Sequence, residues 1–262
     1  MATSSSLSPA SSPVCVVMLH GAAHNHSVWQ HLAEGLQRAG VAVMTPDLPG
    51  HGDCPGPALA DVPACADWVL NLAATQGLHR LVLVGHSMGA LIALEAAAHA
   101  TKHGAAQQLQ VRGLVLLGAA YPMQVSPALL SLALDDAEKA IHKVAQYSHA
   151  REAAAAREAD QHLMQREQTQ YAAAGHGNLL HHDLSLCNDY ASGLQSAAQV
   201  RCRSTLIAGR DDRMTPLAAS AELESVLNAQ RIELATGHNL MAEDPAGVLT
   251  AVLAVCEALA AT

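Results

Sequence analysis

The pentapeptide Gly85-His86-Ser87-Met88-Gly89 constrains the fold more than any other stretch of this chain, because of what flanks it. The residues before it, Leu81-Val82-Leu83-Val84, form a short apolar run of β-formers. Residues 90–99 after it are rich in alanine and contain neither Gly nor Pro. This order predicts a strand, a tight turn and a helix. A G-x-S-x-G turn at such a junction lifts the serine hydroxyl clear of the sheet.

Apolar runs of strand length alternate with helical segments along much of the chain. The predicted strands are residues 14–19, 41–44, 81–84, 114–117, 205–208 and 232–234. The predicted helices are residues 26–39, 59–75, 90–99, 217–227 and 248–260. Repeated βα units pack as a doubly wound, mostly parallel sheet with helices on both faces. We therefore expect an α/β fold of about six strands, with its site beyond the carboxyl ends of the strands.

Residues 121–200 break this alternation. The segment contains no strand-like run, and its predicted helices, 127–147 and 151–171, carry few large apolar residues for their length. A helix with so thin an apolar stripe packs weakly, so we predict a small helical lid over the strand ends. An ordinary pair of surface helices is the alternative. The predicted organisation is then a disordered tail (1–13), a core (14–120 and 201–262) and the lid (121–200).

The composition limits the partners of the chain. Half of the 262 residues are hydrophobic, which suffices for one large core. The net charge of −9, with scattered basic residues, disfavours nucleic acid. No apolar run approaches the length that spans a bilayer, and the first residues lack the features of a targeting signal, so we expect no membrane association. Six widely spaced cysteines without a C-x-x-C pair indicate reduced thiols of a cytoplasmic protein.

A serine hydroxyl becomes a nucleophile only when a base takes its proton, and the base needs a carboxylate to fix its tautomer. His238 follows the last predicted strand, and Asp211 and Asp212 follow the fifth. The resulting order, Ser87, then an aspartate, then His238, is that of the G-x-S-x-G hydrolases. Position alone does not choose between the two aspartates.

Two backbone N–H groups are candidates to bind a developing oxyanion. Met88 stands at the start of the predicted helix, where its N–H has no helical partner. Ala22 stands in the loop after the first strand, where Gly21 lets the Ala22 N–H turn inward. We expect His20 to order this loop by hydrogen bonds rather than to act on the substrate.

Histidine clusters at residues 24–26 and 176–183 are candidate metal sites, but neither has a spacing known for zinc or iron. The glycine-rich stretch 47–52 holds no phosphate-binding pattern. We predict no metal and no other cofactor. Asn25 and His26 are instead candidates to line the substrate pocket, and Asp47 is expected to tighten the turn after the second strand.

Taken together, these residues resemble an α/β-hydrolase-fold serine hydrolase of the small esterase type. The matching segments are His20-Gly21 with Trp29, residues 47–52, the pentapeptide, residues 209–212 with Pro216, and Gly237-His238 followed by Glu243-Asp244-Pro245. The resemblance implies Ser87 as nucleophile, Asp212 as acid, His238 as base, and the N–H groups of Ala22 and Met88 as the oxyanion hole. Full members carry a β-hairpin before the first strand predicted here. Too few residues precede that strand for one, which is why we expect about six strands.

Three functions fit such a chain. The preferred one is hydrolysis of a carboxylic ester, or of a related acyl bond, in a small acyl substrate through an acyl-enzyme on Ser87. The alternatives are a carbon–carbon bond hydrolase of the aromatic-degradation type and a non-catalytic ligand-binding protein on the same fold. The carbon–carbon bond hydrolases have a more glycine-rich oxyanion loop than this chain, so we rank that alternative lower. Dehalogenase and epoxide-hydrolase chemistry needs a carboxylate where Ser87 stands. We make no prediction of the oligomeric state.

Overall fold

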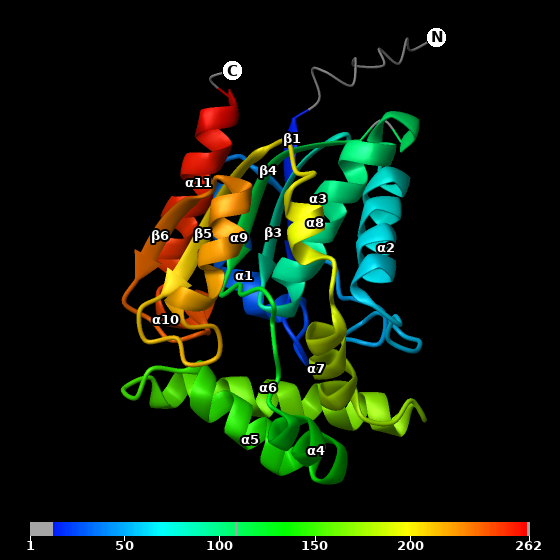
Figure 1. The fold of residues 1–262 in the computed structure, drawn as a ribbon, viewed down its shortest axis with the longest axis vertical. Helices are drawn as coiled ribbons and strands as arrows, with labels where there is room; N and C mark the ends of the chain where they lie inside the picture. The colour runs from blue at the N-terminus through cyan, green and yellow to red at the C-terminus, as the bar shows by residue number, and fades with distance from the viewer. Residues whose placement is uncertain (1–12, 108, 261–262) are drawn as a thin grey trace.

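A single parallel sheet forms the centre of the molecule (Figure 1). The computed structural model describes residues 13–107 and 109–260. Within this part of the chain, six strands pair in the order β2-β1-β3-β4-β5-β6, and every neighbouring pair is parallel. The strands are β1 (Val14–Leu19), β2 (Ala42–Met44), β3 (Arg80–His86), β4 (Gln110–Leu117), β5 (Arg203–Gly209) and β6 (Gln230–Leu234). The predicted α/β class and number of strands are confirmed.

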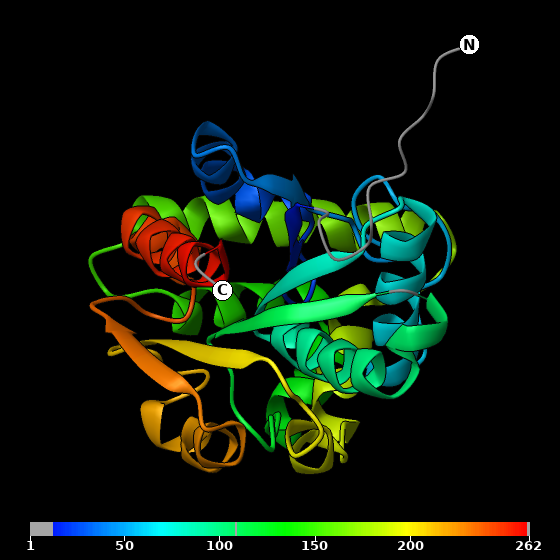
Figure 2. The same ribbon diagram turned by 90° about the horizontal axis from the view of Figure 1, so that it is seen from above.

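Helices cover both faces of the sheet (Figure 2). One face carries α1 (Gln30–Arg38) and α11 (Pro245–Ala260), and the other carries α2 (Val62–Thr75), α3 (Met88–Gln107), α8 (Gly193–Ala197) and α9 (Ala221–Leu227). Side chains of β1 alternate between the two layers, because neighbouring residues of a strand point to opposite faces. Val16 and Met18 pack toward α1 and α11, whereas Val17 and Leu19 pack toward α2 and α3. Burial on both faces explains why the strands are continuous apolar runs.

Most of the predicted helices have different limits from those expected, and two of them show the physical reason. The segment 26–39 is a 3₁₀ helix, η2 (His26–Trp29), followed by α1, and the Asn25 side chain caps η2 by accepting the Ser27 N–H at 2.9 Å. The helix expected from residue 59 begins at Val62. Asp61 stops it there, because its carboxylate accepts the Ala64 N–H at 2.8 Å as an N-cap.

The segment between β4 and β5 is helical, with more helices than the two expected. It holds α4 (Pro127–Asp135), α5 (Ala137–Ser148), α6 (Ala154–Ala173) and α7 (Leu179–Asp189), which we call the cap, and then α8. The predicted helix 127–147 breaks at Asp136, which caps α5 by accepting the Lys139 N–H. The cap lies across the carboxyl ends of the strands (Figure 1).

The last helix of this segment, α8, packs against α3 on one face of the sheet and not in the cap. In α8, the Ser196 hydroxyl donates to the buried Glu95 carboxylate of α3 at 2.6 Å. The predicted division into a core and a lid remains a prediction. The predicted tail falls on residues 1–13, of which residues 1–12 lie outside the described part. Within the described chain, no helix combines the length and the apolar character needed to cross a membrane.

Candidate active site

Ser87 stands on the turn between β3 and α3, at the centre of the carboxyl edge of the sheet. Its φ of +54° lies in the left-handed region that side chains rarely adopt, which is the strained turn expected of this pentapeptide. A Cβ on Gly85 would lie 2.1 Å from the Gly89 oxygen, and one on Gly89 would lie 2.2 Å from the Leu19 oxygen. Only glycine therefore fits at either end of the turn.

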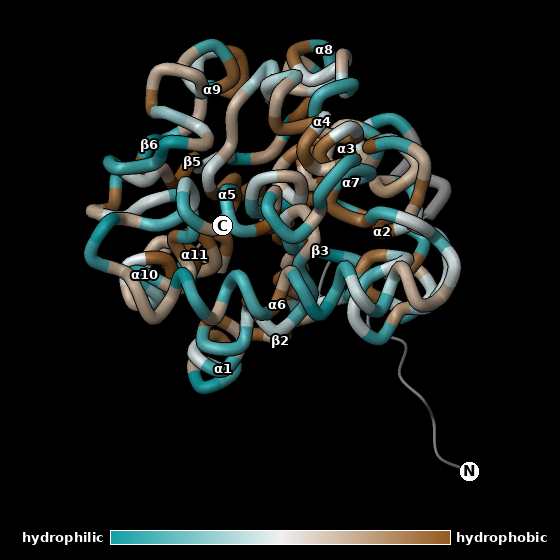
Figure 3. The backbone as a smooth tube through the Cα atoms, turned by 90° about the horizontal axis from the view of Figure 1, so that it is seen from below, coloured by the Kyte–Doolittle hydropathy of each residue, from teal (hydrophilic) through white to brown (hydrophobic). Residues whose placement is uncertain are grey.

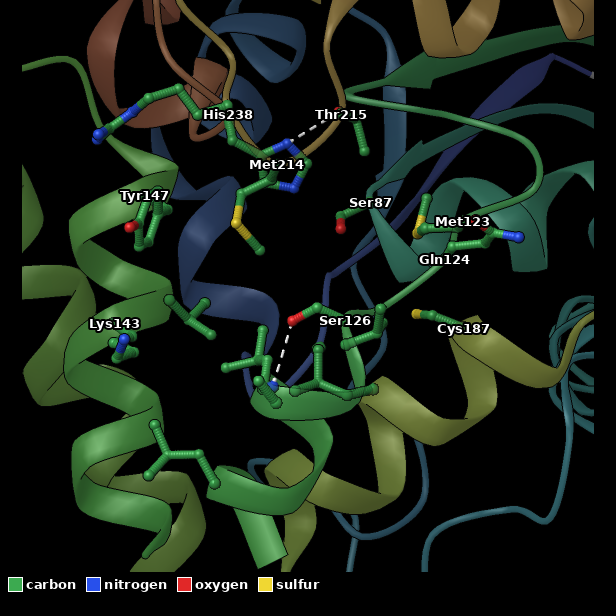
Figure 4. Close-up of a pocket in the computed structure, with 18 residues that line it drawn as sticks. Ser87, Met123, Gln124, Ser126, Lys143, Tyr147, Cys187, Met214, Thr215 and His238 are labelled. Atoms are coloured by element: carbon green, nitrogen blue, oxygen red, sulfur yellow. Dashed lines mark hydrogen bonds between the residues drawn. The ribbon is translucent and has the colours of Figure 1, made fainter.

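His238 lies in the loop after β6 and reaches the same cavity as Ser87 (Figure 4). Its Nδ1 is 2.8 Å from Oδ2 of Asp212, in the loop after β5. The side chains of both residues are almost fully buried. Because Nδ1 faces the carboxylate, the other ring nitrogen is left to exchange a proton on the cavity side. The structure thus brings Ser87, Asp212 and His238 together, whereas Asp211 is exposed.

The Asp212 carboxylate is held in place by three further donors. Oδ1 accepts the N–H groups of Met214 and Thr215, both at 2.8 Å, and Oδ2 accepts the Thr215 hydroxyl at 2.7 Å. Burial by itself raises the pKa of Asp212, but His238 and the bonds from Thr215 outweigh burial and hold it below its ordinary value. Asp212 is therefore a carboxylate at neutral pH.

Two residues that the sequence analysis did not single out fix the position of His238. Burial and the nearby His238 lower the pKa of His86 to about 3, so the His86 ring is neutral. Its Nε2 lies 2.9 Å from the His238 carbonyl oxygen, to which it donates. Gly118, after β4, has a φ of +54°, and a Cβ there would lie 2.9 Å from Cε1 of His238. No local sequence pattern marks Gly118, because the residue that it contacts, His238, is 120 positions away.

The loop after β1 runs against the turn that carries Ser87. A Cβ on Gly21 would lie 3.5 Å from the Ser87 Cβ, and Ala22 lines the same cavity as Ser87. Within the described residues, no backbone hydrogen bond uses the Ala22 N–H. Met88 begins α3, so its N–H also lacks a helical acceptor. His20 orders this loop as expected, since its Nε2 accepts the Leu48 N–H at 3.1 Å.

The structure does not bring Asn25 and His26 to this cavity. Asn25 is buried, and its side chain caps η2 and donates to Glu167 of α6 at 2.8 Å. His26 is half-exposed and binds Asp47, which also accepts the Asp53 N–H at 2.8 Å and so tightens its turn as expected. His26, Asp47 and Asp53 form a group whose possible ligand atoms lie within 4.8 Å of one another. Both carboxylate oxygens of Asp47 already accept a backbone N–H, one from His26 and the other from Asp53.

A cavity of about 360 Å³ lies between Ser87 and the cap. Figure 4 shows Ser87 and His238 at its upper side and the cap helices below and to the left. Apart from Ala22, the aliphatic and methionine side chains that line it are Met123, Val125, Ala128, Leu129, Leu132, Val144, Leu184 and Met214. The charged lining residues are Lys143 and Arg213, so among the described residues no carboxylate lines the cavity. Seen from the cap side, α4 is mostly hydrophobic and α6 mostly hydrophilic (Figure 3).

The family profile described as "Alpha/beta hydrolase family" matches residues 16–251, nearly the whole chain. The chain belongs to the alpha/beta hydrolase family. This hydrolase is also 34% identical over 116 residues to the lipase LipV of Mycobacterium tuberculosis, and the match covers 44% of the chain. The matched segment spans only 41% of the length of that lipase.

Solved esterase structures share the fold of this hydrolase. An esterase from Exiguobacterium antarcticum superposes with a TM-score of 0.74 at 18% identity, over 94% of this chain and 92% of that chain. A thermophilic esterase from Thermogutta terrifontis superposes with a TM-score of 0.78 at 18% identity, over 95% of this chain and 91% of that one. At this identity the likeness concerns the fold alone.

Proposed function

We propose that this α/β hydrolase cleaves carboxylic esters of small acyl substrates through an acyl-enzyme on Ser87. The observation that carries the proposal is that Ser87 and His238 face one cavity while buried Asp212 holds the His238 ring. His238 takes the Ser87 proton as the hydroxyl attacks the ester carbonyl, and the imidazolium is stabilised by Asp212. His238 then gives the proton to the departing alcohol.

The N–H groups of Ala22 and Met88 bind the oxygen that becomes negative in the tetrahedral intermediate. Water enters after the alcohol leaves, and His238 acts as base a second time to release the acid. No metal or cofactor takes part in this scheme. All six cysteines are free, which supports the cytoplasm as the proposed location.

The cavity supports a small substrate with an apolar acyl group. Its volume of about 360 Å³ is near the lower end of the ~300–1,000 Å³ typical of ligand pockets. The wall on the cap side of the cavity includes aliphatic side chains of α4, among them Leu129 and Leu132. We propose that the cap acts as the lid of this cavity.

The test is labelling of the purified protein by a fluorophosphonate, followed by a panel of p-nitrophenyl esters graded by acyl length. We expect wild type to be labelled, Ser87→Ala to remain unlabelled, and turnover to be fastest with short to medium acyl chains. A ring-fission dienone in the same panel tests the carbon–carbon alternative. Absence of labelling in a folded wild-type protein would rule out the proposed chemistry and favour a ligand-binding protein.

A further inference from the structure

The peptide unit that joins Ala22 to Ala23 is held at both of its polar groups. The Ala23 N–H donates to Oδ2 of Asp183 at 2.7 Å, and the Ala22 carbonyl oxygen lies 2.7 Å from Nδ1 of His24. This unit follows directly after the Ala22 N–H, one of the two oxyanion donors proposed above. None of the groups that hold it belongs to Ser87, Asp212 or His238.

Asp183 comes from the cap, 160 residues further along the chain. It lies in α7, is 1% exposed, and also contacts Nε2 of His51 at 2.9 Å. The other His51 nitrogen faces the Pro49 carbonyl oxygen, so both ring nitrogens act as donors and the ring is an imidazolium. Burial lowers the pKa of His51, but the pair with Asp183 outweighs it and raises the pKa above its ordinary value.

His24 links the other side of the peptide unit to the cap. Its Nε2 lies 2.7 Å from Oδ1 of Asp160 in α6, and both residues are buried. Each His24 nitrogen faces an oxygen acceptor, so this ring is also doubly protonated. Asp160 further accepts the Asn239 side-chain amide at 2.9 Å and lies 3.2 Å from His149, which joins the pair to the loop that carries His238.

The backbone at Ala23 needs this support. Its φ of +51° is a left-handed conformation that is strained for an alanine and persists only where the surroundings impose it. Loss of the Asp183 bond would let the loop relax toward ordinary φ values and would move the neighbouring Ala22 N–H. An oxyanion donor works only within about 2.7–3.1 Å of its target, and a misplacement of ~1 Å can cost about 100-fold in rate.

We propose that the cap sets the oxyanion hole: Asp183 directly, and Asp160 through His24, clamp the Ala22–Ala23 peptide as positioning residues. The inference rests on the proposed function, because that function assigns Ala22 as an oxyanion donor. It has one mechanistic consequence. A cap that moves away from the loop takes both carboxylates with it, so the complete hole exists only while the cap is docked.

The test compares Asp183→Asn with a matched control in the same cap, Glu167→Gln. Glu167 is 2% exposed and also binds the core, through Asn25 and the Gly52 N–H, but it does not touch the Ala22–Ala23 peptide. Both variants replace a buried carboxylate by its amide. A difference between them therefore reports on the clamp rather than on cap docking in general.

For Asp183→Asn we expect kcat to fall about 10- to 100-fold, with KM changed less than about threefold. The inhibition constant of an alkyl boronic acid, which mimics the tetrahedral intermediate at Ser87, should rise by a similar factor. For Glu167→Gln we expect both quantities within about threefold of wild type. Amide exchange of Ala23, followed by NMR in each protein, should accelerate only in Asp183→Asn.

Equal kcat and equal boronic acid affinity in the two variants would overturn the clamp while leaving the ester chemistry intact. If Asp183→Asn does not fold, Asp160→Asn takes its place with the same readouts and the same expected direction. Failure of wild type to react with a fluorophosphonate or bind the boronic acid would instead remove the proposed function, and the clamp with it.

Discussion

Asp212 and His238 are joined by a contact of 2.8 Å between two residues that stand 26 positions apart, in loops after neighbouring strands. The parallel pairing of β5 with β6 brings these loops to one edge of the sheet. Asp212 is buried, whereas the adjacent Asp211 is exposed. The difference between the two positions gives a direct experiment.

Asp212→Asn should reduce ester turnover by about 10⁴, because the amide would favour the wrong tautomer of His238. Asp211→Asn should stay within a few-fold of wild type, since an exposed side chain of this kind contributes little to the site. Both variants are to be compared on one ester at one pH. A crippled Asp211→Asn beside an active Asp212→Asn would mean that a different carboxylate orients His238.

Ser87→Ala should lower turnover by several orders of magnitude and leave the melting temperature within a few degrees of wild type. The change removes one hydroxyl at a turn whose backbone is fixed by Gly85 and Gly89. Steady-state rates and thermal melts measure the two effects separately. Retention of more than about a tenth of the rate would exclude Ser87 as the nucleophile.

Gly118→Ala should impair catalysis without touching any group that reacts with the ester. The new Cβ would lie 2.9 Å from Cε1 of His238, at a backbone φ of +54° that alanine adopts with strain. We expect kcat to fall at least about tenfold and fluorophosphonate labelling to slow in parallel. Gly40→Ala is the control, because Gly40 also has a positive φ but a Cβ added there would meet nothing within 4 Å. Equal activity of the two variants would contradict the assigned role of Gly118.

The free energy of unfolding should decrease as the pH rises toward about 9, because buried histidines lose their protons. Burial by itself lowers the pKa of His149, but Asp160 and Glu243, each 3.2 Å away, raise it to about 9. Because the pKa of His149 is higher in the folded protein than in the unfolded chain, the imidazolium stabilises the folded state. This contribution is complete below about pH 6.5, the ordinary pKa, and is lost as the pH rises through about 9. The full effect is about 3 kcal/mol, at ~1.4 kcal/mol per pKa unit.

Urea unfolding measured between about pH 6 and pH 10 checks this expectation. Wild type should lose stability over that range, and His149→Gln should be less stable at the acidic end and less dependent on pH. His24 and His51, whose pKa values are also raised, add to the slope of both proteins. A flat wild-type profile over the whole range would mean that these buried pairs are not charged.

The strands and the turn that carries Ser87 could be predicted because their signals are local. Continuous apolar runs and the glycines beside Ser87 lie within a few residues of what they determine. The acid and the histidine could be predicted because each follows a predicted strand closely. The choice of Asp212 over Asp211 comes from the resemblance and matches the burial of the two side chains. The roles of Thr215 and Gly118 depend on His238, more than twenty positions away in each case, and no local pattern reports them.

The cap shows the limit of periodicity most clearly. The buried residues of α6 are Asp160, Met164, Glu167 and Tyr171, a regular helical stripe in which two of four members are acids. A count of apolar residues alone makes this helix look thinly anchored. Its acids are buried because they form hydrogen bonds with His24, Asn25 and the Gly52 N–H. Those partners stand more than 110 positions earlier in the sequence.

One helix of the cavity wall, α4, carries none of the buried acids that attach the cap to the core, and this separation bears on how the protein can diverge. Ala128, Leu129 and Leu132 of α4 face the cavity, whereas the buried acids that reach the core stand on α6 and α7. Substitutions along α4 can therefore reshape the space for an acyl group without disturbing the charged contacts that hold the cap. A change in the shape of the cavity then needs few substitutions, because the contacts that hold the cap stay the same.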